Sequence, residues 1–549
     1  MKSTYVFLLL FIIKISAVNG QSLTSSNLPI IKVNTNGNTI FDEPKILADL
    51  EIIYNGVDKT NNITDKPNGY LGKVGIEYRG STSQDLFPKK PYGIELWVDS
   101  TQKSRKFALL GMPEESDWVM NATYNDKTLM RDVLSYDLVN RMGRYATRTR
   151  YYEMVINNQY QGLYILMEKI KKDKNRVDIS TLKATDNTGD DVTGGYILKI
   201  DKTEGSKSAS WNTTLPFGSN VYTIPYQIEY PKITDITEAQ FNYIKKYVTD
   251  FETSLKSTDF TNPKAQWRDM VDLDTFVDYF LITEFTKNVD GYRLSTYFYK
   301  DKDSKGGKLK MGPAWDYNLA FGNANYLDGF KTSGWQYKIN DLAVPANDTY
   351  FLAPTWWEKL TSDSTFRYRA SKRWDVLRKT TFNPDRINNW MDSTATVLQP
   401  AMLRNNSRWT GVLGKYVWPN YYVGATYQDE INWMKDWIRQ RTAWLDSQLK
   451  AYGSPLANEQ EITKESLLRV FPNPVENETT IEYGVLKKGR IKINLYDLSG
   501  RLIKTLIDEE KGIKTYQIKF GGENLQSGTY IIDYQLDDLS VERLKLIKK

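Results

Sequence analysis

Residues 288–322, NVDGYRLSTYFYKDKDSKGGKLKMGPAWDYNLAFG, place two acids at the two ends of a strand-forming segment. Asp290 follows a run with the spacing of a helix, and Asp316 stands within Trp-Asp-Tyr-Asn. Between them, residues 296–312 have the aromatic strand character and the turn residues of a β-hairpin. The stretch therefore predicts a helix end, a hairpin and a loop, with one carboxylate on each side of the hairpin.

Along the chain from its N-terminal end, a β-rich region that carries one helix comes first, and a mostly helical region that contains this stretch follows. Asn-Gly turns between alternating apolar and polar residues predict hairpins over residues 28–56, and residues 151–170 predict two strands joined around Asn157 and Asn158. Bulky residues at helical spacing predict helices over residues 126–143, 237–257, 272–291, 355–379, 384–409 and 427–453. A cleft between a β-rich lobe and a helical lobe is a common place for a ligand site.

The chain of 549 residues contains no His and no Cys. This composition excludes Ser-His-Asp and Cys-His catalysis, thiolate and imidazole zinc sites, and disulfide bonds. Carboxylates, Lys, Arg, Tyr, hydroxyls and amides are left for catalysis. A bound metal would therefore be a hard cation held by oxygen atoms, such as Mg, Mn or Ca.

The charges nearly cancel, with 73 basic and 67 acidic residues and a formal net charge of +6. The densest basic run, residues 169–174, has the composition of a solvated strand end or loop. No tract of the kind that follows a phosphate backbone stands out, so we expect no nucleic acid partner.

Residues 1–20 have the pattern of a secretory signal peptide, with Lys2, an apolar run from Tyr5 to Ile13 and small residues before a cleavage point after Gly20. The run is too short to span a bilayer, and Lys14 interrupts it. No later segment is apolar over the length of a membrane span. We therefore expect an exported chain, secreted or at the cell surface, with no transmembrane segment after cleavage.

Residues 451–466 are polar and turn-prone, as in a linker, and residues 467–549 show about seven short strands typical of a small all-β sandwich. This segment resembles the C-terminal sorting domain of the type IX (Por) secretion system. The matching motifs are Phe471–Pro474, Leu495–Arg501, Ser527–Tyr530 and the basic end Leu546–Lys549. The resemblance implies export across two membranes with the secretion machinery as a partner, and the alternative is a generic adhesive Ig-like domain.

Residues 76–450, which follow a β-rich segment at 21–75, resemble the CotH family of spore-coat-protein-H-like kinases. The matching motifs are Tyr78–Ser83, Lys89–Tyr92, Leu129–Asp132, Gly162–Tyr164 with Glu168, Glu284–Gly291 and Gly312–Gly322. The resemblance implies a divergent two-lobed protein-kinase-like fold with a β-rich N-lobe and a helical C-lobe, and thus an α+β chain that ends in the small sandwich. It also implies transfer of phosphate from ATP, with Mg or Mn, to Ser or Thr of an extracellular or surface protein acceptor.

The resemblance assigns the two acids separate roles. Asp290 would orient and deprotonate the acceptor hydroxyl, and Asp316 would hold the metal. Many CotH-like sequences carry a second acid where this chain has Asn318, whose amide oxygen can still bind Mg but neutralises less charge. The alternative interpretation is structural, because Asp290 with Gly291 can form a turn and Asp316 can cap a helix.

Four further residues are candidates for binding the nucleotide: Arg79, Lys90, Glu168 and Asn288. Lys90, or its neighbour Lys89, would supply a point charge for phosphate oxygens, and Arg79 would contact phosphate beside the amides of its polar loop. Glu168 is expected near the hinge between lobes, and Asn288 either binds phosphate or metal or forms an Asx turn. Glu284 can serve catalysis or a structural ion pair.

Two other functions stay open from the sequence. The first is a catalytically degenerate kinase fold that acts in binding or surface assembly, because exposed aromatic residues suit protein or glycan contacts. The tryptophans considered for this role are Trp315, Trp356, Trp357, Trp418 and Trp433. The second is a hydrolase that uses paired carboxylates and an oxygen-bound metal on sugars.

Overall fold

The computed structural model describes residues 23–203, 206, 208–215, 222–453, 468–485, 489–498, 500–512, 514–523, 525–536 and 539–549. The predicted signal peptide, residues 1–20, and most of the predicted linker lie outside these residues. The chain divides into two compact units between Ser454 and Pro455.

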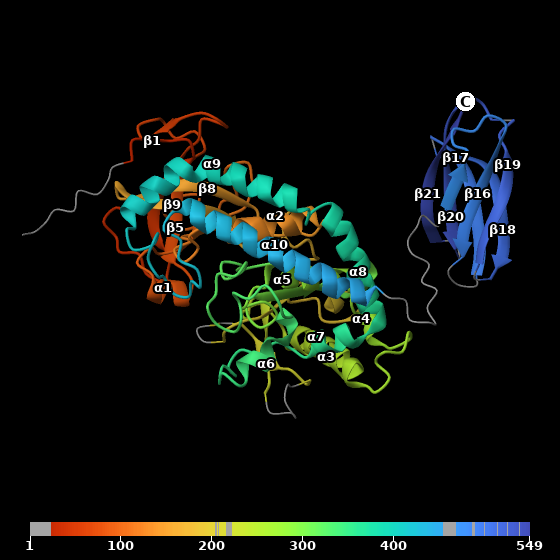
Figure 1. Ribbon diagram of the computed structural model, residues 1–549, viewed down its shortest axis with the longest axis horizontal. Coiled ribbons are helices and arrows are strands. Elements are labelled where there is room, and N and C mark those ends of the chain that lie inside the picture. The colour runs from red at the N-terminus through yellow and green to blue at the C-terminus, as the bar shows by residue number, and fades with distance from the viewer. Residues whose placement is uncertain are drawn as a thin grey trace, which may run out of the picture. The chain divides into compact units, whose positions relative to one another are not determined.

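A closed barrel forms the N-terminal part of the first unit (Figure 1). Its strands, in order around the barrel, are β2 (Ile30–Asn34), β3 (Ile46–Ile53), β5 (Tyr70–Tyr78), β6 (Tyr92–Trp97), β7 (Asp117–Asn121), β9 (Gln159–Glu168) and β8 (Thr149–Ile156). Neighbours are antiparallel except β2 and β8, which pair in parallel and close the barrel. The short strands β1 (Ser25–Ser26) and β4 (Asn61–Asn62) form a separate pair. The predicted division between residues 75 and 76 falls inside β5.

The alternation of side chains along each strand determines which residues fill the interior of this barrel. Leu50 and Ile52 of β3, Val74 and Ile76 of β5 and Ile94 of β6 are buried in one apolar cluster. The predicted junction of β8 and β9 at Asn157 and Asn158 is confirmed, since both residues adopt positive φ angles of 49° and 62° in the tight turn.

A second sheet lies in the first unit, in the order β11 (Ser210–Asn212), β12 (Pro225–Tyr230), β10 (Tyr196–Ile200), β13 (Thr296–Lys300) and β14 (Leu309–Met311). The predicted hairpin is confirmed as β13 and β14, in which Phe298 lies opposite Met311. The sequence did not reveal that β10 pairs with β13 over its whole length, which brings Asp201 and the segment after Ile200 next to the hairpin.

Helices fill the rest of the first unit. They are α1 (Thr82–Leu86), α2 (Arg131–Arg141), α3 (Glu238–Lys256), α4 (Trp267–Met270), α5 (Leu273–Thr286), α6 (Ile339–Ala343), α7 (Trp356–Ser362), α8 (Ser364–Lys379), α9 (Pro384–Arg408) and α10 (Tyr427–Tyr452). Thr237 and Thr426 start α3 and α10 with reciprocal caps from Gln240 and Asp429. The segment predicted as one helix over 355–379 is two helices, because Asp363 has an extended backbone and its carboxylate caps α8.

The helical part is built around α5, which is buried on all sides, as expected for a helix with apolar residues around its whole circumference. Trp356 and Trp357 pack in the same core with no exposed surface, so these two tryptophans are structural. The long helices α9 and α10 run side by side across the unit, and the C-terminal end of α9 reaches the barrel strand β9 (Figure 1).

The structure therefore confirms a chain of mixed α and β structure in which a β-rich part precedes a mostly helical part. The β-rich part is a closed seven-stranded barrel. The two-lobed kinase-like arrangement stays a prediction.

The second unit is all-β. One sheet holds β15 (Leu468–Phe471), β16 (Glu478–Val485) and β19 (Lys514–Gly521), and the other holds β18 (Leu502–Lys511), β17 (Gly489–Asp497), β20 (Gly528–Leu536) and β21 (Leu539–Lys548). Residues of both sheets share one buried cluster, including Ile481 of β16 and Ile493 of β17. Two sheets over one core make the sandwich that the spacing of short strands predicted.

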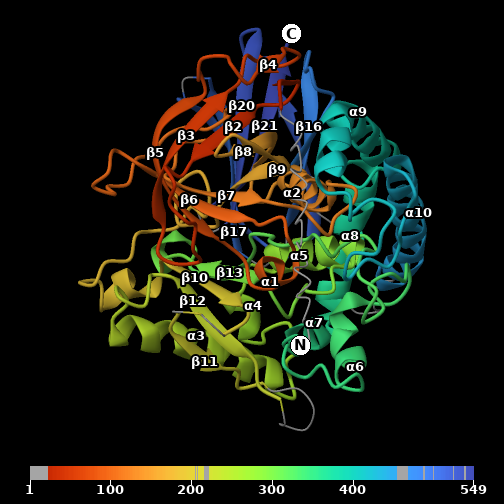
Figure 2. The ribbon, with the colours of Figure 1, turned by 90° about the vertical axis from the view of Figure 1, so that its left-hand side faces the viewer.

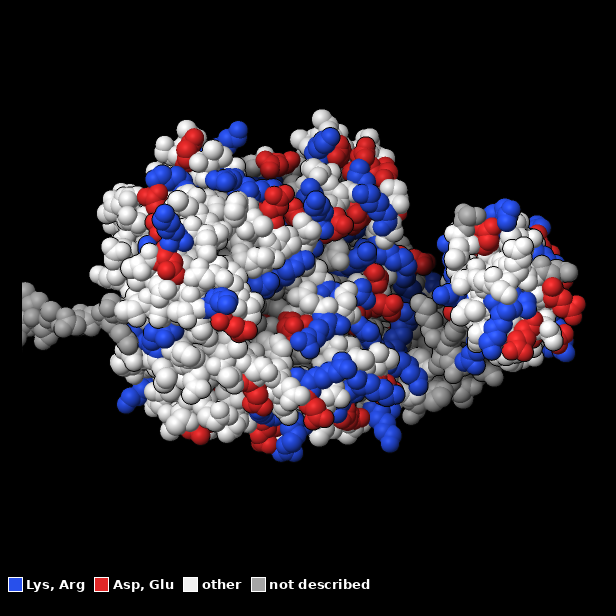
Figure 3. Space-filling model, turned by 90° about the horizontal axis from the view of Figure 1, so that it is seen from above, with Lys and Arg blue, Asp and Glu red and all other residues white. Residues whose placement is uncertain are grey.

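Within the part of the chain that the structure describes, no helix combines the length and the apolar character that crossing a bilayer requires. Figure 3 shows one face of the molecule, on which basic and acidic side chains lie interspersed.

Candidate active site

A cleft of about 1150 Å³ lies between the barrel and the second sheet of the first unit. In Figure 2 the barrel strands β5, β6 and β7 lie above the strands β10, β12 and β13 of the second sheet. The barrel side includes Arg79–Ser83, Asn121 and Lys169, and helix α2 contributes Asp132 and Tyr136. The facing side includes Lys199, Asp201, Lys202, Asp290, Arg293, Trp315, Asp316 and Asn318. The volume is at the upper end of the range for small-molecule sites.

Asp290 enters this cleft from the turn that follows α5. The helix ends at Lys287, which adopts a left-handed φ of 46°, and the side-chain oxygen of Asn288 accepts the Asp290 N–H at 3.3 Å. The Asp290 carboxylate is 14% exposed and lies 3.9 Å from the Arg293 guanidinium. Burial raises the pKa of Asp290, and the charge of Arg293 opposes that rise.

Asp316 enters the same cleft from the loop after β14. Its backbone adopts a left-handed φ of 62°, and its N–H donates to the Tyr136 hydroxyl at 3.0 Å. Burial raises its pKa well above the ordinary value, and repulsion from Asp132 and Asp290 adds to the effect. A cation bound here would relieve this repulsion.

Asn288 joins the two acid-bearing loops. Its amide nitrogen donates to the Asp316 carbonyl oxygen at 2.9 Å, while its amide oxygen accepts from Asp290. Both polar atoms of the buried side chain are thus bonded to backbone, and Asn288 is not among the residues that line the cleft. The structure places it as a clamp between Asp290 and Asp316.

Asp132 is an acid of this site that the sequence analysis did not select. Its carboxylate accepts from the Tyr317 N–H at 2.7 Å, from Asn121 at 3.0 Å and from the Tyr136 hydroxyl at 3.3 Å. Burial raises its pKa to about 6. The motif Leu129–Asp132 was a signal for it, but only the fold brings the start of α2 to the loop that carries Asp316.

Asn318 lines the cleft two residues after Asp316. Its amide nitrogen donates to the side chain of Asn125 at 3.3 Å. The amide oxygen is therefore the atom that remains available as a metal ligand.

Arg79 lies on the opposite wall of the cleft, at the end of β5. Its guanidinium lies over the ring of Trp315 at 5.1 Å, and its charge lowers the pKa of Asp316 against the larger effects that raise it. Trp315 in turn stacks on Tyr136 with ring centroids 6.3 Å apart. This aromatic contact connects the predicted phosphate-binding arginine with the loop that carries Asp316.

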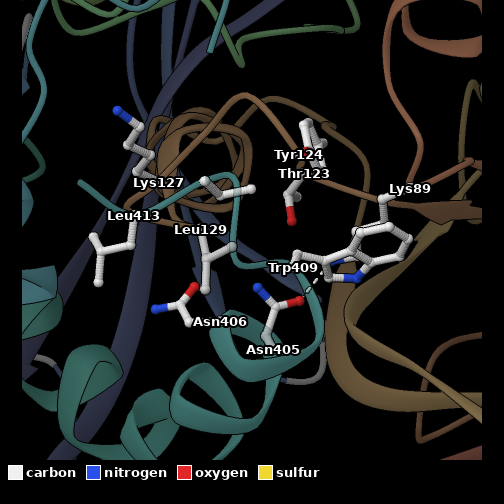
Figure 4. A pocket seen from close by; sticks show the side chains of 10 residues that line it. Lys89, Thr123, Tyr124, Lys127, Leu129, Asn405, Asn406, Trp409 and Leu413 are labelled. Atoms are coloured by element: carbon white, nitrogen blue, oxygen red, sulfur yellow. Dashed lines mark hydrogen bonds between the residues drawn. The ribbon is translucent and has the colours of Figure 1, made fainter. Parts of the chain in front are cut away.

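The two candidate lysines of the barrel have other contacts. The Lys90 ammonium donates to the Gln84 carbonyl oxygen, and Lys90 is not among the residues that line the cleft. Lys89 lines the cleft, but it is buried, and it donates to the Leu163 carbonyl oxygen at 2.5 Å and to the Asn405 amide oxygen at 2.9 Å. Figure 4 shows Lys89 and Asn405 in the pocket that both residues line. Lys89 therefore attaches α9 to the barrel, and Lys90 braces the loop around α1.

Glu168 is fully buried at the end of β9 and does not line the cleft. It accepts hydrogen bonds from Arg148 at 2.8 Å and from Tyr145 at 3.2 Å, and lies 3.7 Å from Arg176. These contacts give it a structural role between the barrel and the loop that follows β9.

A family model described as CotH kinase protein matches residues 76–445, which is more than half of the chain. This chain belongs to the CotH kinase family. The CotH region covers the barrel strands β6 to β9, nearly all the residues that line the cleft, the helices α1 to α9 and most of α10.

The comparisons include one curated relative, an inner spore coat protein H of Bacillus subtilis (strain 168), which is 25% identical over 305 residues, 54% of this chain and 70% of that protein. Among solved structures, the Pseudomonas fluorescens alkylpurine DNA glycosylase AlkC bound to DNA containing an abasic site analog matches at 9% identity, over 41% of this chain and 79% of that chain, with a TM-score of 0.11. A TM-score this low carries no argument about the fold.

A second family model, a secretion system C-terminal sorting domain, matches residues 469–549. The all-β second unit is therefore a sorting domain. It indicates interaction with the secretion machinery and export to the cell surface or beyond it. The predicted signal peptide stays a prediction, because it lies outside the described residues.

The CotH kinase region offers a partial ligand set for the expected Mg or Mn. Among the described residues, no group of three or more acidic side chains is arranged to hold a metal ion by itself. Mg²⁺ in phosphotransferases commonly uses one or two carboxylates and completes its shell with water and substrate phosphates. Asp316 and the Asn318 oxygen on one wall fit that kind of site.

Proposed function

We propose that the CotH kinase domain transfers phosphate from ATP to Ser or Thr hydroxyls of proteins outside the cell or on its surface. The observation that carries the proposal is that Asp290 and Asp316, at the two ends of the β13–β14 hairpin, line one cleft. Phosphoryl transfer needs an oriented nucleophile and neutralised phosphates, and little covalent chemistry. A site without His or Cys can supply both.

In this proposal Asp290 accepts the proton of the acceptor hydroxyl. Asn288 fixes its backbone, and Arg293 counteracts the rise in pKa that burial causes, so more of the carboxyl is ionised. Asp316 and Asn318 would hold Mg or Mn, which would supply charge neutralisation for the phosphates. The sorting domain supports acceptors that lie outside the cell.

The test is incorporation of labelled phosphate from ATP, with Mg or Mn, into the full-length chain itself and into dephosphorylated casein as a general acceptor. We expect Asp290→Asn and Asp316→Asn each to lower the rate by about 100-fold or more. Asp392→Asn, at a mostly exposed acid on α9, is the matched control and should keep the wild-type rate. Equal incorporation by wild type and both cleft variants would reject the proposal.

A binding protein with a degenerate site is the second candidate, and two observations favour it. An amide, Asn318, stands in the proposed metal site, and the described residues contain no ready-made cluster of acids for a metal. Thermal unfolding with ATP and Mg separates the two functions, because a ligand that binds the folded chain raises its Tm. Stabilisation by ATP without phosphate transfer would favour a degenerate nucleotide site, and a flat response would favour a binding module.

A further inference from the structure

We propose that Arg79 and Lys169 form the phosphate-binding pair of the cleft, in the role that the sequence had assigned to Lys90 or its neighbour Lys89. The inference rests on the proposed function in that ATP is the expected ligand. The pair is not expected to be selective for ATP, since any linear chain of phosphates could bind to the two cations.

Arg79 and Lys169 follow two different strands of the barrel, and both side chains line the cleft. Arg79 directly follows β5, and Lys169 directly follows β9, two strands that are separated in the barrel by β6 and β7. Both side chains line the cleft that contains Asp316. Desolvation lowers the pKa of Lys169 and the charge of Arg79 adds to this effect, although the Lys169 residue keeps exposed surface.

Neither cation forms a salt bridge with a described carboxylate, although the charges of Asp117 and Glu229 act on Lys169 and partly offset the lowering of its pKa. Two other basic residues of the cleft do form ion pairs, with Lys199 2.9 Å from Glu229 and Arg293 2.9 Å from Asp348, whereas Lys202 donates to the Thr82 hydroxyl. Arg79 and Lys169 form no such ion pair with a described carboxylate, and Arg79 contacts the neutral ring of Trp315. Two adjacent like charges without a counterion are unfavourable unless an anion binds between them.

The segment after Arg79 turns tightly and brings polar side chains to the cleft. Gly80 has a left-handed φ of 93°, and a Cβ atom at this position would lie 2.3 Å from the Ser83 hydroxyl oxygen, so the turn itself requires glycine. Ser81, Thr82 and Ser83 line the cleft and bring hydroxyl groups beside the guanidinium. Hydroxyls and a fixed guanidinium are donors that suit phosphate oxygens.

The pair also explains how the cleft can do without Lys90. Asp132, Asp290 and Asp316 concentrate negative charge in the cleft, and repulsion among them raises the pKa of Asp316. Cations are needed beside such a cluster before a polyanion can enter. Arg79 and Lys169 supply that charge on the barrel wall, so a phosphate chain would run from this pair towards Asp316.

The experiment is calorimetric titration of the full-length chain with inorganic tripolyphosphate and, separately, with ATP, each with and without Mg. We expect Lys169→Met and Arg79→Met each to weaken tripolyphosphate binding by about tenfold or more, and to raise KM for ATP more than they lower kcat. Lys174→Met, at an exposed lysine of the same basic run, is the matched control. Lys90→Met tests the earlier prediction that Lys90 binds the phosphates. Lys174→Met should bind as wild type, Lys90→Met should lose less affinity than either cleft variant, and circular dichroism checks that every variant is folded.

The outcomes separate this inference from the proposed function. Tripolyphosphate binding that is lost in both cleft variants supports the pair even if no phosphate transfer is found. Phosphate transfer with unchanged KM in both variants, or weaker binding in Lys90→Met alone, overturns the pair and leaves the kinase activity standing. A wild-type chain that binds neither tripolyphosphate nor ATP overturns both.

Discussion

The Tyr136 hydroxyl accepts the backbone N–H of Asp316 at 3.0 Å and so links α2 to the loop after β14. A left-handed backbone is uncommon for a residue other than glycine, and Asp316 holds φ at 62°. The same hydroxyl donates to Asp132 at 3.3 Å. The position of the proposed metal-binding acid thus depends on a tyrosine 180 residues earlier in the chain.

Tyr136→Phe should impair the site without emptying the core. The change leaves the buried Asp316 N–H without an acceptor, which costs about 1–3 kcal/mol of unfolding free energy, and it should weaken metal binding. Tyr247→Phe, which loses a hydrogen bond to the Met270 carbonyl far from the acids, is the control. Urea unfolding and Mn²⁺ titration check both variants, and equal metal affinity in Tyr136→Phe and wild type would contradict this prediction.

Arg293→Gln should move the acid side of the pH–rate profile to higher pH. Asp290 works as a base only when ionised, and burial already raises its pKa while Arg293 lowers it. Removal of the guanidinium raises that pKa further, so phosphate transfer should fall at a higher pH than in wild type. The measurement is kcat/KM for ATP against pH. Arg439→Gln, at an exposed surface arginine, should leave the profile in place.

The unfolding free energy should increase as pH rises above neutrality, because Lys89 has a lowered pKa in the folded chain. Burial lowers its pKa from 10.5 to about 7. Between these values the unfolded chain binds more protons than the folded chain, so the unfolding free energy increases with pH, by at most about 1.4 kcal/mol per pH unit. Unfolding from pH 7 to about pH 9 should therefore show a smaller slope for Lys89→Met than for wild type. Parallel slopes would show that Lys89 is charged in the folded chain.

Glu284 is a structural acid. Its carboxylate lies 3.1 Å from Arg441, both side chains have no exposed surface, and the Gln336 and Tyr337 N–H groups donate to it. Arg441→Met should lower the unfolding free energy by about 3–5 kcal/mol because it leaves a buried carboxylate unpaired.

The exposed pair of Arg439 and Asp436 provides the control for this ion pair. Arg439→Met should cost less than about 1 kcal/mol. The double variant Arg441→Met with Glu284→Gln should be more stable than the sum of the single changes implies. If the losses of unfolding free energy in the two single variants simply add in the double variant, as measured by chemical denaturation, Arg441 and Glu284 do not form a stabilising buried pair.

Gly322→Ala should destabilise the first unit through packing. Gly322 has a φ of 74°, and a Cβ atom there would lie 2.5 Å from the side chains of Trp433 and Trp437. Gly306→Ala is a matched control, because Gly306 has nearly the same φ of 76° and no atom within 4 Å of the added Cβ. The control should lose only the conformational strain of about 1–2 kcal/mol, and Gly322→Ala should lose clearly more. Thermal unfolding of the two variants gives the comparison.

Local signals predicted much of the helical and hairpin structure. The Thr caps set the start of α3 and α10, and the Asn157–Asn158 turn sets the β8–β9 hairpin. The closure of the barrel was not predicted, because the β2–β8 pair joins Ile30 to Glu153 and leaves no signal within either strand. The division of 355–379 was missed because the cap at Asp363 lies inside an otherwise continuous helical pattern.

The residues of the candidate site, too, could be predicted only in part from local sequence signals. Asp290, Asp316, Asn318 and Arg79 were selected from motifs and all line the cleft. Lys90 and Glu168 were selected by the same means, but Lys90 donates to the Gln84 carbonyl oxygen and Glu168 pairs with Arg148, so neither lines the cleft. Asp132 stands in the family motif Leu129–Asp132 and Lys169 in the densest basic run, but no local pattern assigned either residue, or Tyr136, to the cleft.

The sequence by itself determined the elements, the family motifs, and the kind of chemistry that a chain without His or Cys can perform. These properties depend on residue type and on short spacing, which are local. Only the tertiary structure decided which charged groups share a cleft, that Asn288 clamps two loops, and that Arg79 and Lys169 both line that cleft. Burial, charge repulsion and hydrogen bonding act through space, so they depend on contacts between segments that lie far apart along the chain.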